Sequence, residues 1–376
     1  MVDATETTQA QITNAPQFRV AVLGATGMVG QRFVSLLEHH PWFKVVVVAA
    51  SPSSAGQPYR QAVAERWHML GSIPVAVADL TVRSVVDDLA RIAHEVDLAF
   101  CALNMDKEAI RRIECDYAAA GVAVVSNNSA HRWTEDVPMI MPEVNPDHTA
   151  LIKLQRHKRG WTTGLIAVKP NCSIQSYVSV LTALRAYTPT AVDVTSLQAI
   201  SGAGKTFETW PDMIDNVIPF IGGEEDKSER EPMKIWGNVT AQGLTLATSP
   251  RIVATCIRVP VTDGHMATVR ITFAKQPHRD DIIAAVTHYA NPLADLALPS
   301  APRQLIEYYE EDDRPQTRLD RDREHGMGIS MGRLRQVSDH EWQCVTLSHN
   351  TVRGAAGGAI LMAELLVAQG YLTSRG

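Results

Sequence analysis

The sequence predicts an α/β protein made of a parallel sheet wound on both sides by helices, followed by an α+β domain with a mixed sheet. Three observations support this. The 376 residues exceed one ordinary single-core domain. Short buried strands alternate with helical patterns in the first half, as in a doubly wound sheet. Longer β-branched runs with few helices between them fill the second half.

The strands of the first half are short apolar runs. We expect them at residues 18–23, 45–50, 97–102, 122–126 and 164–168. The run at 45–50 is continuous in Val and Ala, which is typical of strands that are buried on both faces in parallel sheets. A helical pattern follows the first strand through Leu37, and another, at 176–186, follows the last.

The second half is expected to form its own sheet. Its strand-like runs are residues 195–200, 252–260 and 266–273. A charged excursion at 205–237, interrupted by three prolines, separates the first two runs and is expected to be partly helical. The final pattern, 354–372, predicts an apolar helix that belongs to the core, packs on the N-terminal domain or lies in a subunit contact.

These patterns divide the chain into four parts. We expect a disordered N-terminal lead at 1–17, a nucleotide-binding domain at 18–168, a second domain at 169–345 and a C-terminal helix at 346–376 that returns to the first domain. The five cysteines show no CxxC pairing, which favours free thiols in the cytoplasm over disulfides or a structural metal site. The net charge of −6 argues against nucleic-acid binding, and no apolar run is long enough to span a membrane.

Three glycines between the first strand and the first helix predict a Rossmann-type dinucleotide site. Gly24, Gly27 and Gly30 form a GxxGxxG loop. Glycine allows a tight turn and close approach of backbone N–H groups to a pyrophosphate, which the helix N-terminus also attracts. We expect cofactor contacts from Gly24, Thr26, Gly27, Met28 and Val29.

The end of the second strand predicts which dinucleotide binds. NAD sites usually place an acidic side chain there to hold the ribose 2′-hydroxyl. Residues 49–56 read AASPSSAG and contain no acid. Small hydroxyl side chains accommodate a 2′-phosphate, so we predict NADP, with Ser51 and Ser54 at the phosphate.

Cys172 is the candidate nucleophile. It lies between an apolar strand and a helical pattern, near the positive end of a helix dipole, and this position predicts a field that favours the thiolate. The alternative is that Cys172 is a small buried apolar residue.

Four further segments place this cysteine in a larger pattern. They are PNCS at 170–173, LQAISGAG at 197–204, GGEE at 222–225 with Glu231 and Lys234 beyond it, and CIRVPVTDGH at 256–265. Together with GATGMVGQ at 24–31, they resemble the aspartate-β-semialdehyde dehydrogenase family, in its archaeal and fungal branch, which also contains malonyl-CoA reductases. The resemblance extends from Phe18 to the C-terminal helix.

The resemblance implies a covalent mechanism and a role for each matching residue. Cys172 is the nucleophile, His265 the acid/base, Gln198 orients the substrate and Arg258 grips its α-carboxylate. The remaining matches are Asn171 for the oxyanion or phosphate, Glu231, Lys234 and Arg132 for substrate and phosphate, and Ser201, Gly202 and Asn350 for the cofactor. For Glu231 and Lys234, a solvated ion pair is the alternative.

Two positions depart from the family pattern. The segment KTFETW at 205–210 replaces an aromatic, Pro-Gly stretch, and Lys169 stands where Asn is commoner. Both are expected near the substrate site, so they affect which acyl substrate is predicted and leave the predicted thioester chemistry unchanged.

The resemblance predicts an NADP-dependent aspartate-semialdehyde dehydrogenase of lysine, threonine and methionine synthesis, acting on a small substrate and inorganic phosphate without a metal. The 205–237 excursion matches the family's dimer interface, so a homodimer or homotetramer is expected. The main alternative is a malonyl-CoA or related acyl-CoA reductase. A glyceraldehyde-phosphate dehydrogenase, an N-acetylglutamyl-phosphate reductase, which would carry Gly at position 171, and a catalytically dead nucleotide sensor fit the motifs less well.

Overall fold

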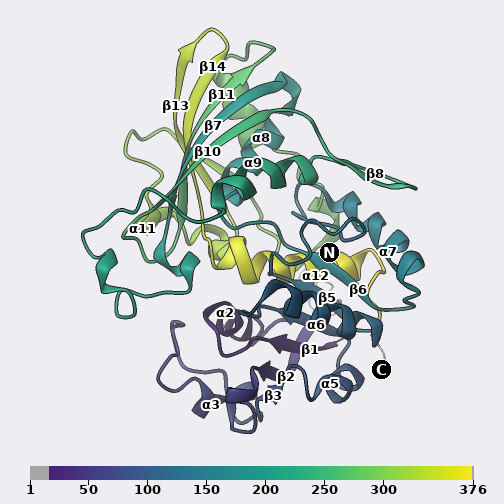
Figure 1. Ribbon diagram of the computed structural model, residues 1–376. Helices are drawn as coiled ribbons and strands as arrows, with labels where there is room; N and C mark the ends of the chain where they lie inside the picture. Colours follow the sequence, from purple (N-terminus) through teal and green to yellow (C-terminus); the bar gives the residue numbers. More distant parts are fainter. Residues whose placement is uncertain (1–16, 375–376) are drawn as a thin grey trace, which may run out of the picture.

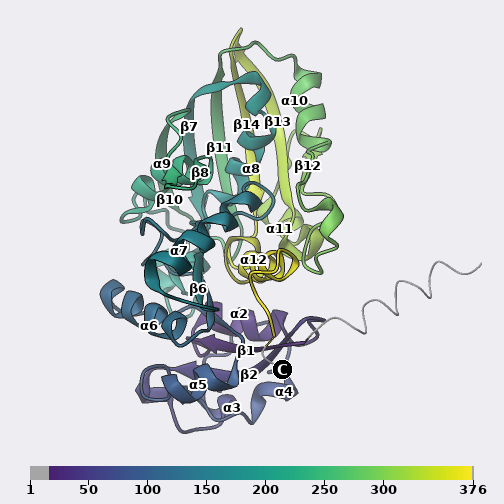
Figure 2. The same cartoon turned by 90° about the vertical axis from the view of Figure 1, so that its right-hand side faces the viewer.

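The computed structural model describes residues 17–374. The predicted lead at 1–17 therefore lies, except for Gln17, outside the described residues. The chain forms two lobes, each built on a six-stranded sheet, and the C-terminal helix lies between them (Figures 1 and 2). This arrangement confirms the predicted fold class.

The first sheet is parallel throughout, in the order β3-β2-β1-β4-β5-β6. Residues alternate between its two faces, so Ala21 and Leu23 join one apolar core while Val20 and Val22 join another. Each predicted strand of the first half is present, with ends that differ by at most two residues. The strands are β1 Phe18–Leu23, β2 Phe43–Ala50, β3 Arg83–Ser84, β4 Leu98–Cys101, β5 Ala123–Ser126 and β6 Leu165–Val168.

Helices cover both faces of this sheet, as a right-handed parallel topology requires. In chain order they are α2 Met28–Leu36, α3 Tyr59–Ala62, α4 Val75–Ala78, α5 Leu89–Glu95, α6 Lys107–Ala119 and α7 Leu151–Arg159, with short 3-10 turns η1 Pro52–Ser54 and η2 Pro146–Ala150. The glycine loop joins β1 directly to α2, and η1 follows the end of β2. The two segments expected to bind the cofactor therefore lie at the same edge of the sheet.

The second sheet is mixed, in the order β10-β7-β11-β14-β13-β12. Its inner strands are antiparallel, whereas β10 with β7 and β12 with β13 are parallel. The strands are β7 Pro189–Gln198, β10 Arg251–Arg258, β11 His265–Phe273, β12 Ile306–Tyr309, β13 Ile329–Ser338 and β14 Glu341–Ser348, and a separate hairpin pairs β8 Asn238–Thr240 with β9 Gly243–Thr245. The three strand-like runs predicted in this half are β7, β10 and β11.

Helices pack on one face of the second sheet. The helix after Cys172, α8 Gln175–Ala183, contacts β11 and β14, and α10 Arg279–Thr287 contacts β12 and β13. The predicted excursion at 205–237 is an extended loop with one 3-10 turn, η5 Pro211–Met213, followed by α9 Glu224–Ile235 on β10. The remaining short elements are η3 Arg185–Tyr187, η4 Ile200–Ala203, η6 Ala294–Leu296, α11 Thr317–Asp320 and η7 Arg323–Gly326.

The C-terminal helix belongs to the hydrophobic core. The regular helix α12 spans Gly357–Ala368, shorter than predicted, and a distorted π-turn, η8 Val352–Ala356, precedes it. Every α12 residue from Gly357 to Leu366 is buried, so this helix is not available for the subunit contact that the sequence left open. It contacts α2 and β5 of the first sheet. Among residues 17–374, no helix is both long and apolar enough to cross a bilayer.

Candidate active site

Cys172 lies between β6 and α8, on a pocket of about 230 Å³. Both halves of the chain form its walls. Of the residues predicted for the site, the pocket wall contains Val29, Arg132, Asn171, Cys172, Ser201, Gly202 and Asn350. The pocket therefore brings the helix after the glycine loop to the candidate nucleophile.

His265 faces the thiol. Its Nε2 lies 3.5 Å from Cys172 Sγ, and the backbone N–H of Ala199 donates to its Nδ1 at 3.1 Å. Because Nδ1 accepts a hydrogen bond, the neutral ring carries its proton on Nε2 and directs it toward the sulfur. Burial, with Arg258 second, lowers the pKa of His265 to about 3. The ring is thus a neutral hydrogen-bond donor at physiological pH.

The thiol of Cys172 does not have the low pKa that its position at the start of a helix predicts. Burial, followed by the Glu224 carboxylate, raises its pKa to about 11, against the opposing charges of Arg132, Lys169 and Arg258. The prediction of a thiolate favoured by the helix dipole was therefore wrong for the protein without ligands. Loss of hydration and the Glu224 carboxylate are the two largest causes, and both favour the neutral thiol.

Arg258 and Gln198 end two neighbouring strands. They are partners in the parallel register of β10 and β7, so both side chains reach the same edge of the second sheet. Arg258 donates through Nη1 to the carbonyl of Ala199 at 2.6 Å. A Cβ added to Gly202 would lie 3.0 Å from both Arg258 Nη1 and the ring of His265. Glycine at 202 therefore keeps the approach to this arginine and this histidine open.

Glu231 and Lys234 are not a solvated ion pair; both are buried on α9. Glu231 accepts from Arg132 Nη1 at 2.8 Å and from the backbone N–H of Asn171 at 2.6 Å. Lys234 instead donates to three backbone carbonyls, those of Arg132, Thr134 and Val137, at 2.7, 3.2 and 2.9 Å. The two side chains hold the arginine and the Cys172 loop in place from behind, and among the described residues neither forms part of the pocket wall.

The wall also contains residues that the sequence analysis did not select. Glu224 accepts from Asn171 Nδ2 at 3.0 Å and from Lys227 Nζ at 2.7 Å. Their spacing with Glu231 was the available signal, because positions 224, 227 and 231 share one helical face. Gly354 was also missed; a Cβ there would lie 2.7 Å from Cys172 Cβ, so glycine lets η8 contact the nucleophile.

Lys169, the departure from the family pattern, lies beneath the cysteine. It is 2% exposed, and a Cβ on Gly358 would lie 2.8 Å from its Nζ. Burial, with Arg353 second, lowers its pKa to about 7. The nearby Arg353 is itself neutralised by Glu143, which accepts from it at 2.8 Å.

The glycine loop has the shape that a dinucleotide requires. A Cβ on Gly24 or Gly30 would lie 2.3 or 2.1 Å from a backbone oxygen, whereas the atom nearest to a Cβ on Gly27 is 3.5 Å away. Gly24 and Gly30 permit the close backbone packing of the turn. Among the described residues, a Cβ on Gly27 would have only Gly24 O within 4 Å, which leaves room for a pyrophosphate in front of the N-terminus of α2. Asn350 donates to Ser201 Oγ at 2.8 Å and accepts from Gly264 N–H at 2.8 Å, which joins the predicted nicotinamide-side residues to the His265 turn.

The predicted phosphate serines lie at the other end of the nucleotide site, after β2. Ser51 is exposed and its hydroxyl lies 2.9 Å from that of Ser53. Ser54 is buried, and its hydroxyl accepts from Arg66 Nη2 at 3.2 Å. These serines do not line the Cys172 pocket.

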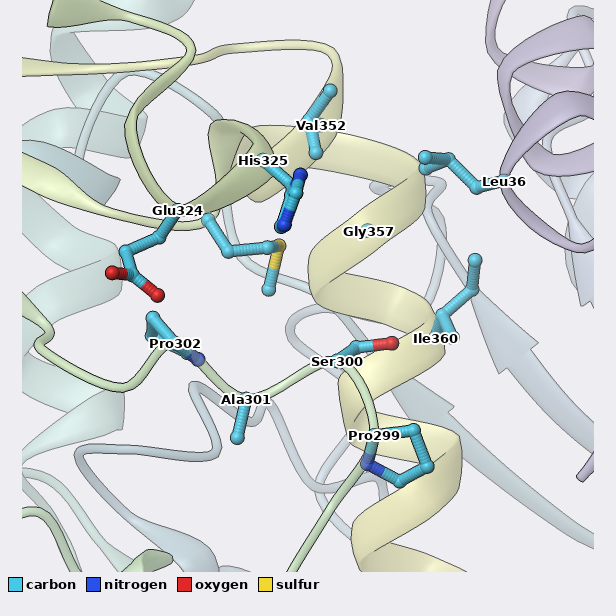
Figure 3. A pocket seen from close by; sticks show the side chains of 11 residues that line it. Leu36, Pro299, Ser300, Ala301, Pro302, Glu324, His325, Val352, Gly357 and Ile360 are labelled. Carbon is cyan, nitrogen blue, oxygen red and sulfur yellow. The ribbon is translucent and has the colours of Figure 1, made fainter. Parts of the chain in front are cut away.

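A second cavity, of about 190 Å³, lies where α2, α12 and two loops meet (Figure 3). Leu36, Val352 and Ile360 give it an apolar wall, and Ser300, Glu324 and His325 give it a polar side. It contains none of the predicted site residues.

Comparison with known proteins agrees with this geometry. Two family models match, "Semialdehyde dehydrogenase, NAD binding domain" over residues 19–152 and "Semialdehyde dehydrogenase, dimerisation domain" over residues 181–353. The aspartate-semialdehyde dehydrogenase of Archaeoglobus fulgidus is 42% identical over 351 residues, covering 93% of this chain and 98% of the relative. That of Schizosaccharomyces pombe is 41% identical over 361 residues, covering 94% and 99%.

Solved structures give the same result. The crystal structure of aspartate-semialdehyde dehydrogenase with NADP from Candida albicans matches with a TM-score of 0.83 and 37% identity, over 95% of this chain and 100% of that one. Aspartate-semialdehyde dehydrogenase II from Vibrio cholerae matches with a TM-score of 0.69 and 26% identity, over 93% and 98%. With near-complete coverage in sequence and in structure, the chain belongs to the aspartate-semialdehyde dehydrogenase family.

Proposed function

We propose that this protein catalyses the reversible, NADP-dependent reductive dephosphorylation of β-aspartyl phosphate to aspartate semialdehyde and phosphate. This reaction belongs to lysine, threonine and methionine synthesis, and we place it in the cytoplasm. The observation that carries the proposal is the 3.5 Å contact between Cys172 Sγ and His265 Nε2, beside the buried guanidinium of Arg258. The relatives with this name extend over almost the entire chain.

Cys172 and the residues around it support the following steps. The Cys172 thiol first releases its proton to solvent. The thiolate then attacks the carbonyl carbon of the acyl phosphate, a C–S bond forms, the C–O bond to phosphate breaks, phosphate leaves, and a thioester remains on the enzyme. Val29, Ser201, Gly202 and Asn350 would hold the nicotinamide end of NADPH, and the chemistry that it would supply here is a hydride for this thioester. The resulting alkoxide of the thiohemiacetal develops next to the Nε2–H of His265, which stabilises it as a hydrogen-bond donor. The C–S bond then breaks, which releases the aldehyde and restores the thiolate.

We assign different cationic side chains to the two anionic groups of the substrate. Arg258 has a planar fork suited to the α-carboxylate. Arg132 and Lys227 line the Cys172 pocket, and we assign them to the phosphate. Gln198 is 1% exposed next to Arg258, and we assign it the orientation of the bound substrate. Glu231 and Lys234 are positioning residues in this proposal, because they act through Arg132 and Asn171.

The domain division and the assembly are also proposed. The first sheet ends at Val168, which supports a nucleotide-binding domain of 18–168. β14 runs to Ser348, three residues beyond the proposed end of the second domain at 345. The match to a dimerisation domain over 181–353 and the uncovered outer face of the second sheet support a homodimer or homotetramer.

The test is a substrate panel with two cysteine variants. We expect phosphate-dependent reduction of NADP by aspartate semialdehyde. Cys172→Ser should lose at least about 1,000-fold in kcat, because a neutral hydroxyl is a much weaker nucleophile than a thiolate. Cys115→Ser is the control, since Cys115 is a half-buried free cysteine outside the pocket.

The alternative is an acyl-CoA reductase, and the relatives do not favour it. Absence of turnover with aspartate semialdehyde, together with malonyl-CoA-dependent oxidation of NADPH, would overturn the proposal.

A further inference from the structure

An arginine from beyond the η1 turn lies at the end of β2. Arg66 lies twelve residues beyond Ser54, after α3, and its Nη2 donates to Ser54 Oγ at 3.2 Å. Its Nε donates to the carbonyl of Ala62 at 3.0 Å, which directs the guanidinium back toward η1. The guanidinium therefore lies beside Ser54, in the turn that is expected at the ribose end of the nucleotide site.

The glycine loop and α2 hold this segment in place. Gln31, in α2, is 1% exposed and donates through Nε2 to the carbonyls of Thr26 and Arg66, at 3.0 and 2.7 Å. Its Oε1 accepts from the backbone N–H of His68 at 2.9 Å. Tyr59 adds a second connection by donating to the carbonyl of Ala25 at 2.9 Å. The position of Arg66 is therefore set by the same residues that shape the pyrophosphate loop.

The guanidinium of Arg66 keeps donors available. It is exposed, and none of the carboxylates within residues 17–374 forms an ion pair with it. A guanidinium has five N–H donors in a planar fork that matches phosphate oxygens. Only two of its nitrogens are engaged, by Ala62 and Ser54. The neighbouring hydroxyls of Ser51 and Ser53 contact each other and are exposed.

We propose that Arg66 binds the 2′-phosphate of NADP and is the main source of the preference for NADP over NAD. The hydroxyls of Ser51 and Ser53 complete this subsite. Ser54 acts as a positioning residue, because it is buried and its hydroxyl already accepts from the guanidinium. This refines the sequence prediction, which placed Ser54 itself at the phosphate. The inference rests on the proposed function only for the identity of the cofactor.

Equilibrium binding tests the proposal without catalysis. The dissociation constants of NADP, NAD, adenosine 2′,5′-bisphosphate and 5′-AMP are measured by calorimetry on the wild type and on Arg66→Ala. We expect Arg66→Ala to weaken NADP and the bisphosphate about 10- to 100-fold, as for a lost charge-assisted hydrogen bond. The affinities for NAD and 5′-AMP should change less than about twofold, which also shows that the variant is folded.

Arg60→Ala is the matched control. Arg60 belongs to the same segment, is paired with Asp79 and is 53% exposed. Its substitution therefore removes the same charge without removing a contact to the serines. Arg66→Lys should recover part of the affinity, and Ser54→Ala should weaken NADP less than Arg66→Ala does.

Equal affinity of wild type and Arg66→Ala for NADP, or an equal loss in Arg60→Ala, would overturn the proposal. A failed turnover assay with aspartate semialdehyde would overturn the proposed function instead, and would leave these binding constants unaffected.

Discussion

At the scale of single residues, the candidate nucleophile is held in its protonated form. Cys172 has a pKa raised to about 11, and His265, with a pKa near 3, does not form a stable imidazolium partner for it. An unliganded enzyme with a protonated thiol is protected against unproductive alkylation or oxidation, since the thiolate is the reactive form. In the proposed function, the charges of the substrate phosphate and of the cofactor enter this pocket, so the reactivity of Cys172 without ligands describes the resting enzyme.

This electrostatic balance predicts how Cys172 reacts with iodoacetamide. Because the pKa is raised, the thiolate fraction and the alkylation rate should rise about tenfold per pH unit between pH 7 and pH 10. Glu224→Gln removes the second cause of the raised pKa and should accelerate alkylation at pH 8. The measurement is a pH series of the rate constant by mass spectrometry.

Asp226→Asn is the control for that experiment, because it removes one charge from the solvated face of α9. A rate that levels off near pH 7 in the wild type would contradict the raised pKa.

Lys169 predicts a pH-dependent stability. Burial lowers its pKa from 10.5 to about 7, so the folded state binds fewer protons than the unfolded state between pH 7 and pH 10.5. The cost of burying the charged amine is full below pH 7 and falls as the pH rises through this window. Lys169→Met should therefore raise the free energy of unfolding more at pH 6 than at pH 9.5, as measured by urea denaturation.

Lys153→Met, at an exposed position on α7, should show the same small effect at both pH values. A Lys169→Met effect that does not change between pH 6 and pH 9.5 would show that the amine is not destabilised by burial.

At the scale of elements, two glycines of the β1–α2 loop have different roles, because Gly30 is needed for packing and Gly27 for cofactor binding. Gly30 packs against backbone, and a Cβ added there would lie 2.1 Å from Gly24 O, whereas a Cβ on Gly27 would have, within residues 17–374, only Gly24 O within 4 Å, at 3.5 Å. Gly30→Ala should lower the unfolding temperature by several degrees, since the backbone must move. Gly27→Ala should leave that temperature within about 2 °C of the wild type but weaken NADP binding at least about tenfold, because its methyl group occupies the space in front of the helix N-terminus.

Thermal unfolding without cofactor and calorimetry with NADP check this pair of variants. The interpretation of the loop would be wrong if Gly27→Ala bound NADP normally.

At the scale of the whole molecule, the helices within residues 17–374 that pack on the second sheet cover one of its faces. Its outer face carries half-exposed apolar residues on three adjacent strands, including Leu197, Val253 and Met266. The loop before α9 adds Ile214, Val217 and Phe220, which are 61%, 55% and 64% exposed. An apolar face of this kind is typical of a subunit interface.

This face predicts the effect of a charge on assembly. Light scattering of the wild type should give two or four times the chain mass of 41.2 kDa. Val253→Glu, at a position 38% exposed on β10, should shift the protein toward monomer because a buried carboxylate in an interface is costly. Val337→Glu, at a similarly exposed position on β13, 39%, is the matched control. A wild type of 41.2 kDa at micromolar concentration would contradict the predicted assembly.

Much of the fold could be predicted from the sequence, which also proposed a set of candidate site residues. The glycine loop, the continuous Val and Ala strands and the β-branched second half depend on local geometry, so their order along the chain was enough to predict both sheets. The family motifs likewise predicted Cys172, His265 and Arg258 as site residues, and the structure places His265 3.5 Å from Cys172 Sγ and both His265 and Arg258 beside Gly202.

Only the tertiary structure determined the contacts between these residues and their effects on one another's pKa. Burial is a property of packing, and it reversed the expected effect of the helix dipole on Cys172. Packing also turned Glu231 and Lys234 from a possible surface pair into buried supports for Arg132, and it brought Arg66 to Ser54 across twelve residues of chain. Desolvation and long-range contacts depend on which segments meet in space, and no local pattern in the sequence encodes that.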